Sequence, residues 1–149
     1  MRSEAIHLGG NVTITVREGD RVVSSQTVHN LVVTGGRNLL RDLLRGSYEG
    51  NPALRHIAVG TSNTAPAAGQ SALVAEVYRQ VIIGMSVTEG SLNVQGYLGT
   101  SEANGETLKE AALFNVEGLM VARALFEAEV VKTESLTVSL SWDLNISAA

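Results

Sequence analysis

The chain has 149 residues and a formal net charge of −4, and its length suits one domain rather than two. It has no cysteine, which excludes disulfide bonds, thiolate nucleophiles and cysteine-ligated metal sites. Charged residues make up only 17% of the chain, so we interpret its surface as one that partners largely cover, with a weakly charged monomer as the alternative.

The basic residues are concentrated in the amino-terminal part. Residues 1–60 hold seven arginines and five acidic residues, whereas the remainder holds four basic and ten acidic residues. This balance disfavours general nucleic-acid binding, but it would let the first part contact an acidic partner surface. The sequence shows neither the apolar core of a signal peptide nor a run of about 18 apolar residues. We therefore expect a soluble protein, made in the cytoplasm, that has no membrane segment.

The first ten residues have no hydrophobic period, and we predict that they form an amino-terminal arm. A single β-rich domain is then expected over residues 11–149. Its first two strands are predicted at residues 11–17 and 21–29, where apolar and polar residues alternate, and the short turn between them indicates a hairpin.

One α-helix is predicted at about residues 35–46. Thr34 is a plausible N-cap, and Gly46 closes the segment as a C′ glycine does. Leucines recur at helical spacing at positions 39, 40, 43 and 44. No other segment of the chain shows a comparable helical pattern.

The rest of the chain predicts further strands, separated by turns. They are expected at residues 54–60, 81–88, 91–98, 119–131 and 135–146. Residues 61–70 indicate a surface loop, Leu73 to Arg79 fits either a helical turn or an extended segment, and Gly84 suggests a bulge. The last strand alternates strictly, and we predict that its Trp142 anchors the core, with an interface role as the alternative.

Together these elements predict a mainly β fold. Strand signals far outnumber helical ones, and turns recur at the spacing of an antiparallel β-sandwich or a jelly-roll-like barrel. We expect one such domain, with one short α-helix and an amino-terminal arm.

The sequence offers no catalytic or metal-binding motif. It lacks the nucleophile-elbow and Walker patterns, and its histidines, His7, His29 and His56, are not at metal-ligand spacing. Two glycine turns, at residues 60–62 and 99–101, are more simply β-turns than phosphate sites. Two acidic pairs, Glu106 with Glu110 and Glu127 with Glu129, are typical of a solvated face. We predict a protein that is not an enzyme and has no cofactor or metal.

The candidate interaction residues lie on the helix and in the arm. Arg37, Arg41 and Arg45 are spaced i, i+4 and i+8, which puts three guanidinium groups on one stripe. The stripe is either a solvated helix face or a site for ion pairs with acids of a neighbouring subunit, and phosphate binding is a weaker alternative. In the arm we nominate Ile6, His7 and Leu8 as interaction residues.

Three stretches resemble small virion proteins of tailed bacteriophages. The first is a strand ending in V-G-T at residues 59–61, followed by T-A-P at 64–66 and an L-x-x-E-x-x-R element at 73–79. The second is E-A-A-L-F at residues 110–114, where Ala112 replaces a common glycine. The third, residues 122–146, resembles a closing hairpin with an A-R-x-x-F strand, a lysine turn and a final W-x-x-x-I strand.

This resemblance implies a β-rich virion structural protein, commonly a homotrimer, without enzymatic activity. A short chain with an arm and a basic first part fits a capsid decoration (cementing) protein. Such a protein would bind the major capsid protein on the outer surface of the shell and stabilise it. The alternative is a tail, baseplate or fibre protein with tail or baseplate partners. Neither role implies contact with nucleic acid or membrane.

Overall fold

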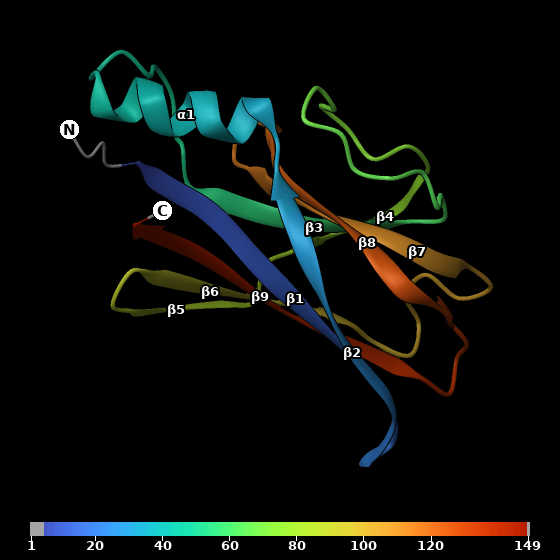
Figure 1. The fold of residues 1–149 in the computed structure, drawn as a ribbon. Coiled ribbons are helices and arrows are strands. Elements are labelled where there is room, and N and C mark those ends of the chain that lie inside the picture. Colours follow the sequence, from blue (N-terminus) through green and yellow to red (C-terminus); the bar gives the residue numbers. More distant parts are fainter. Residues whose placement is uncertain (1–4, 149) are drawn as a thin grey trace.

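The computed structural model describes residues 5–148, which form nine β-strands and one short α-helix (Figure 1). The helix, α1 (Thr34–Leu44), follows the second strand. The strands are β1 (Ile6–Glu18), β2 (Arg21–Val32), β3 (Leu54–Gly60), β4 (Glu76–Val81), β5 (Gly84–Thr88), β6 (Ser91–Leu98), β7 (Thr107–Asn115), β8 (Met120–Val131) and β9 (Thr137–Ala148). The mainly β class and the single short helix predicted from the sequence are confirmed.

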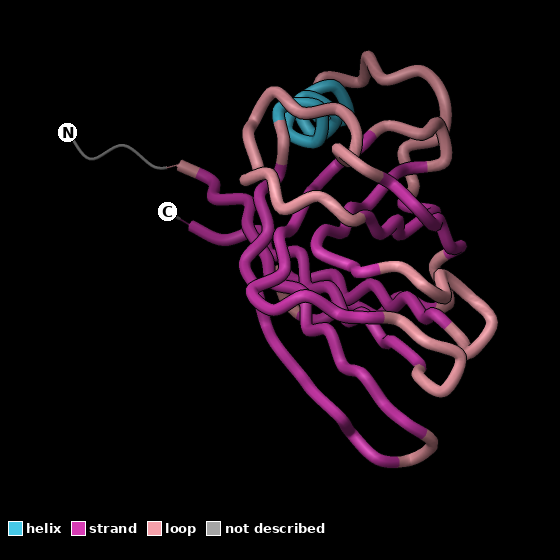
Figure 2. Tube along the Cα trace, turned by 90° about the vertical axis from the view of Figure 1, so that its right-hand side faces the viewer, coloured by secondary structure: helices cyan, strands magenta, loops and turns pink. Residues whose placement is uncertain are grey.

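The strands form one antiparallel sheet that curls into a half-barrel, in the order β4-β3-β7-β8-β2-β1-β9-β6-β5. Only three residue pairs join β2 to β8, at Asn30 to Val32, so the sheet has two halves that face each other across the core. The tip of the β1–β2 hairpin extends past the rest of the body (Figure 2). This architecture is compatible with the sandwich or barrel that the sequence predicts.

The two edges of the sheet are consecutive in the sequence. β4 ends one half and β5 ends the other, and only Ile82 and Ile83 separate them. The Ile82 amide donates to the carbonyl of Arg55 on β3, and the Ile83 amide donates to that of Gln95 on β6, both at 2.9 Å. The chain itself therefore bridges the two halves where the half-barrel would otherwise open.

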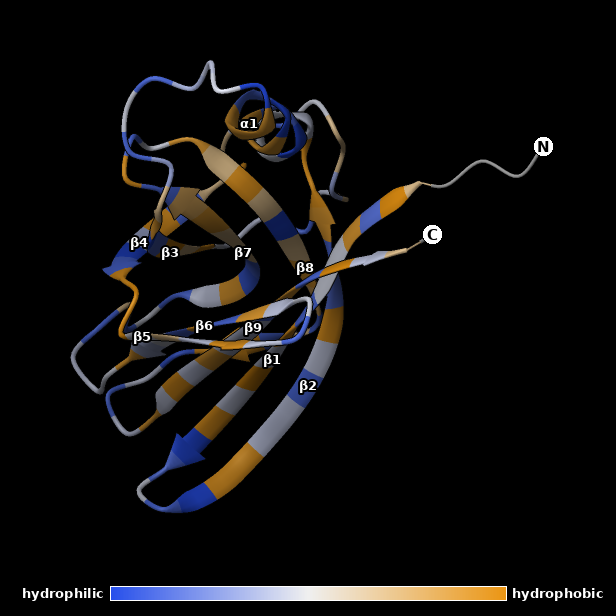
Figure 3. Ribbon diagram, turned by 90° about the vertical axis from the view of Figure 1, so that its left-hand side faces the viewer, coloured by the Kyte–Doolittle hydropathy of each residue, from blue (hydrophilic) through white to orange (hydrophobic). Residues whose placement is uncertain are grey.

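The main core fills the concave side of the curled sheet. Apolar and polar residues alternate along β1, β6 and β9, as the hydropathy colouring shows (Figure 3). The buried apolar residues of these strands belong to one core cluster, so they lie on the inner face. Trp142 is fully buried between Val12 of β1 and Val94 of β6, and its indole Nε1 donates to Asn30 Oδ1 at 3.2 Å. The predicted role of Trp142 as a core anchor is confirmed.

The helix lies close against β8. A Cβ at Gly36 would lie 2.4 Å from the carbonyl oxygen of Val121, so only glycine permits this approach. Thr34 is the first helical residue and not the predicted N-cap, a place that Val33 takes without a side-chain bond. Gly46 has a φ of +69° just past the helix, which confirms the predicted C′ glycine.

Most of the predicted boundaries shift by three residues or fewer, but two predictions differ more from the structure. The arm expected over residues 1–10 is strand from Ile6 onward, because residues 6–10 pair with the carboxyl-terminal end of β9, while residues 1–4 lie outside the described part of the chain. The strand expected at 81–88 is divided at Ile82, where the chain crosses from one half of the sheet to the other. Gly84 begins β5 rather than forming a bulge.

Candidate functional site

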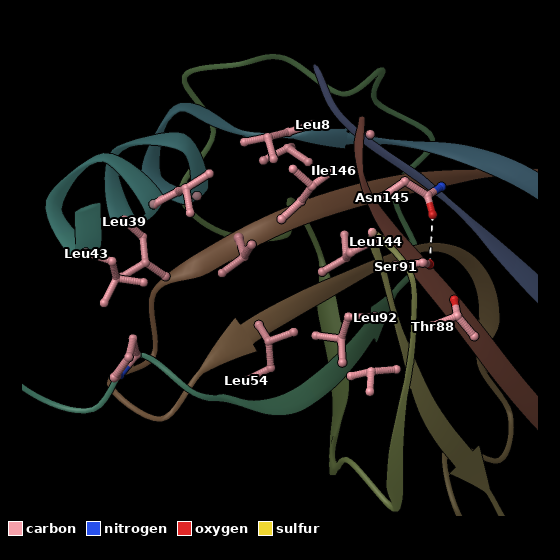
Figure 4. A pocket seen from close by; sticks show the side chains of 18 residues that line it. Leu8, Leu39, Leu43, Leu54, Thr88, Ser91, Leu92, Leu144, Asn145 and Ile146 are labelled. Carbon is pink, nitrogen blue, oxygen red and sulfur yellow. Dashed lines mark hydrogen bonds between the residues drawn. The ribbon is translucent and has the colours of Figure 1, made fainter. Parts of the chain in front are cut away.

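An apolar groove lies at the end of the half-barrel beside α1 (Figure 4). It has a volume of about 440 Å³. Its walls come from α1, from the amino-terminal end of β1, from the β5–β6 hairpin and from the last residues of β9. The residues whose large apolar side chains line it are Leu8, Val32, Leu39, Leu40, Leu43, Leu54, Val87, Leu92, Val121, Leu144 and Ile146.

None of the eighteen residues that line the groove is charged. Its polar side chains are few, and two of them are already paired, because Ser91 Oγ donates to Asn145 Oδ1 at 2.8 Å. Several apolar side chains at the rim face solvent, with Val87 78% and Ile146 54% exposed. An uncovered apolar surface of this kind is typical of sites that bind another molecule.

A second hollow adjoins the groove where β1 and β2 separate. The residue pairs between these strands begin at Asn11 and His29, so the first residues of β1 pair only with β9. The hollow, which we call the slot, has a volume of about 480 Å³ and shares Leu8 with the groove. Four of the residues nominated from the sequence line it: Ile6, His7, Leu8 and Arg37.

The rest of the arginine stripe does not join the slot. Arg41 donates from Nε to Asp42 Oδ1 at 2.8 Å and from a guanidinium nitrogen to Asn38 Oδ1 at 3.2 Å. This ion pair lowers the pKa of Asp42 below its ordinary value and raises that of Arg41. Arg45 is exposed at the C-cap of the helix. The structure thus separates Arg37 from the other two arginines.

A buried ion pair lies elsewhere, between β7 and β8. Glu110 and Arg123 are both fully buried, and a guanidinium nitrogen of Arg123 lies 2.9 Å from Glu110 Oε1. The carboxylate also accepts the backbone amides of Ser62, Val74 and Ala75, at 2.9–3.1 Å. The ion pair therefore anchors both ends of the segment from residue 61 to 75.

That segment, residues 61–75, has no charged residue and covers the outer face of β3, β7 and β8. Arg123, on β8 beneath this segment, also donates to the carbonyl of Thr64 at 2.7 Å. Leu73 packs into a second, smaller apolar cluster with Phe114, and Arg79 stacks on the Phe114 ring at 3.9 Å from its centroid. Residues from the first two phage-like stretches and Arg123 of the third are therefore in contact.

Lys132, the lysine of the third phage-like stretch, is buried at the end of β8. Its Nζ donates to Asn104 Oδ1 at 2.7 Å and to the carbonyl of Thr133 at 2.9 Å. Burial lowers the pKa of Lys132, and the charge of Glu102 partly opposes this effect. The lysine thus fixes the loop before β7 to the turn that leads to β9.

Sequence reasoning missed both the groove and the Glu110–Arg123 pair. The groove is assembled from segments far apart in the chain, so no local sequence pattern predicts it. Part of the pair had a signal, because Arg123 stands between two alanines in an apolar strand, and Glu110 directly precedes the apolar run at residues 111–114. Charged residues are almost never fully buried unless they are paired.

The three histidines do not form one cluster. His7 and His29 border the slot, while His56 is on β3 at the other side of the sheet. Within residues 5–148, no group of three or more histidine, aspartate or glutamate side chains is placed to hold a metal ion. His56 is half-buried, and its burial, together with the charges of Arg79 and Arg55, lowers its pKa below the ordinary value.

The lowered pKa of His56 predicts a loss of stability in mild acid. The unfolded chain takes up a proton at this residue near pH 6.5, whereas the folded chain resists it. Stability should therefore fall as the pH drops below about 6.5, and this contribution should level off below the folded pKa. Urea unfolding at pH 8 and pH 5.5 measures the effect, and His56→Gln should reduce the difference. An unchanged difference in the variant would contradict this assignment.

The one helix that the structure describes, with 11 residues, is too short to cross a membrane. Comparisons with protein-family models, with curated proteins and with solved structures gave no match for this chain.

Proposed function

We propose that this chain is a non-enzymatic structural subunit of a tailed-phage virion, and specifically a capsid decoration protein. It binds the outside of the assembled shell as an oligomer and stabilises the shell. The observation that carries the proposal is the uncharged groove next to the slot that holds Arg37. This surface offers apolar contact and one cation, and it suits a protein partner. That the partner assembly is a tailed-phage virion is inferred from the three stretches of the sequence that resemble phage virion proteins.

The proposed contact on the shell follows from the chemistry of the site. A segment of the major capsid protein with an apolar side chain beside an acidic one would place the first in the groove and the second near Arg37. Each contact is small, but linked contacts made by an oligomer reinforce each other through a high effective concentration. Because the protein binds the assembled shell, it stabilises the shell by mass action.

Binding to shells of the same phage tests the proposal. Purified protein should bind expanded shells at micromolar concentration, with hundreds of copies per particle. Arg37→Gln should weaken this binding several-fold and reduce its salt dependence, whereas the control Arg45→Gln, at an exposed helix end, should not. Failure to bind both expanded shells and undecorated precursors would contradict the proposal. Co-purification with tail proteins, in tens of copies, would favour the tail or baseplate role.

A further inference from the structure

The two edge strands of the sheet differ in how they are protected. β4 carries Glu76 and Arg79, whose side chains form an ion pair at 2.8 Å. β5 has no charged residue and no proline, and among the described strands it has a neighbour, β6, on one side only. Natural proteins usually protect a free edge with charges, prolines or bulges, because its unpaired amides and carbonyls attract other strands.

Exposed apolar side chains accompany this free edge. Every second residue from 81 to 87 is large, apolar and open to solvent: Val81 (45%), Ile83 (62%), Met85 (47%) and Val87 (78%). Met85 and Val87 pair with Val94 and Leu92 of β6, so they lie on the concave face that the core fills farther along the sheet. The apolar face of the sheet therefore continues past the core to its edge.

We propose that β5 pairs with β5 of a second copy of this chain, antiparallel and about a two-fold axis at Ser86. Ser86 is the middle residue of β5, so this register pairs all five residues of the strand. Residues opposite each other lie on the same face, and Met85 of one copy meets Val87 of the other there. One symmetric contact thus covers the β5 edge of each copy, and apolar side chains flank the paired strands.

Charge favours a second copy as the occupant of this edge. Residues 80–88 carry no charge, so the paired strands bring no like charges together. The nearest acid, Glu89, lies three residues from the axis, and the two copies of it are therefore about 20 Å apart, beyond the screening distance in physiological salt. A partner strand with charged side chains would find no opposite charge on this edge to pair with.

A five-residue ladder with its flanking side chains is a small interface, so we expect a dimer that dissociates at micromolar concentration. This inference does not depend on a role in a virion. The two-fold contact yields dimers, and it differs from the homotrimer that the phage resemblance implies.

The lack of cysteine in the chain gives a direct test of the register. In Ser86→Cys the two new thiols face each other at the axis, at a Cα separation of about 5 Å that a disulfide spans. Mild oxidation should therefore convert most of this variant into a covalent dimer. Thr88→Cys is the matched control, because its two copies lie about 14 Å apart along the ladder and should stay largely monomeric.

Sedimentation of reduced protein tests the contact independently. Met85→Lys, at an exposed site on β5 outside the groove, should shift the monomer–dimer midpoint at least tenfold upward in concentration, whereas Val23→Lys, at an exposed site on the β1–β2 hairpin, should leave it unchanged. Circular dichroism confirms that each variant is folded. A trimer without cross-linking at residue 86, or equal cross-linking of the two cysteine variants, would overturn the inference. Shell binding by a Met85→Lys monomer would leave the proposed function intact, because Met85 does not line the groove.

Discussion

Replacing Arg123 by methionine is expected to lower the free energy of unfolding by about 3–5 kcal/mol. The substitution removes the partner of Glu110 but leaves its carboxylate in a site without solvent access. Urea unfolding followed by circular dichroism measures the loss. Lys109→Met is the control, because Lys109 lies 3.8 Å from Glu129 in a partly exposed pair, and its loss should cost less than about 1 kcal/mol. Equal losses in both variants would contradict the structure.

A double variant separates the ion pair from its surroundings. If Glu110→Gln and Arg123→Met act through one interaction, the combined loss should be clearly smaller than the sum of the single losses. The segment at residues 61–75 provides a local measure, because the carboxylate accepts the amides of Ser62, Val74 and Ala75. In Glu110→Gln, hydrogen exchange at these three amides should become faster through local opening of the segment, by more than the loss of global stability explains.

Replacing Trp142 by alanine is expected to cost about 3–5 kcal/mol, because it leaves a large cavity between β1 and β6. The loss also leaves Asn30 Oδ1 without its indole donor. Thermal unfolding, followed by circular dichroism, measures the change. Tyr97→Ala on β6 is the control, since Tyr97 is 39% exposed and should lose less than half as much. A Trp142→Ala variant as stable as Tyr97→Ala would place the tryptophan outside the core.

The fold follows from the sequence wherever local alternation reports burial. In the segment around Trp142, strict alternation predicted a strand within two residues of the observed β9 at each end. Alternation fails at Ile6–Gly10, where two glycines interrupt it and only pairing with β9 makes the segment a strand. It also fails at Ile82, because the turn between the two halves of the sheet depends on hydrogen bonds to distant strands.

The candidate site was predictable only in part. Helical spacing nominated three arginines as one stripe, but the structure puts Arg37 at the slot, whereas Arg41 pairs with its neighbour Asp42. Ile6, His7 and Leu8 were nominated as part of the predicted arm. They line the same slot because β1 and β2 separate there. The groove could not be predicted, since it depends on which strands border the open end of the curled sheet.

The order of the strands has a consequence for how the chain reaches its native state. The first strand and the last are neighbours, and they form a ladder of twelve residue pairs from Ile6↔Ala148 to Arg17↔Thr137. On a ribosome this ladder cannot form until residues 137–148 have been synthesised, and Trp142 lies in that same segment. Such non-local pairing slows folding to the range of about milliseconds to seconds. Until then β1 and β2 stand as a hairpin whose apolar face is uncovered and prone to aggregate.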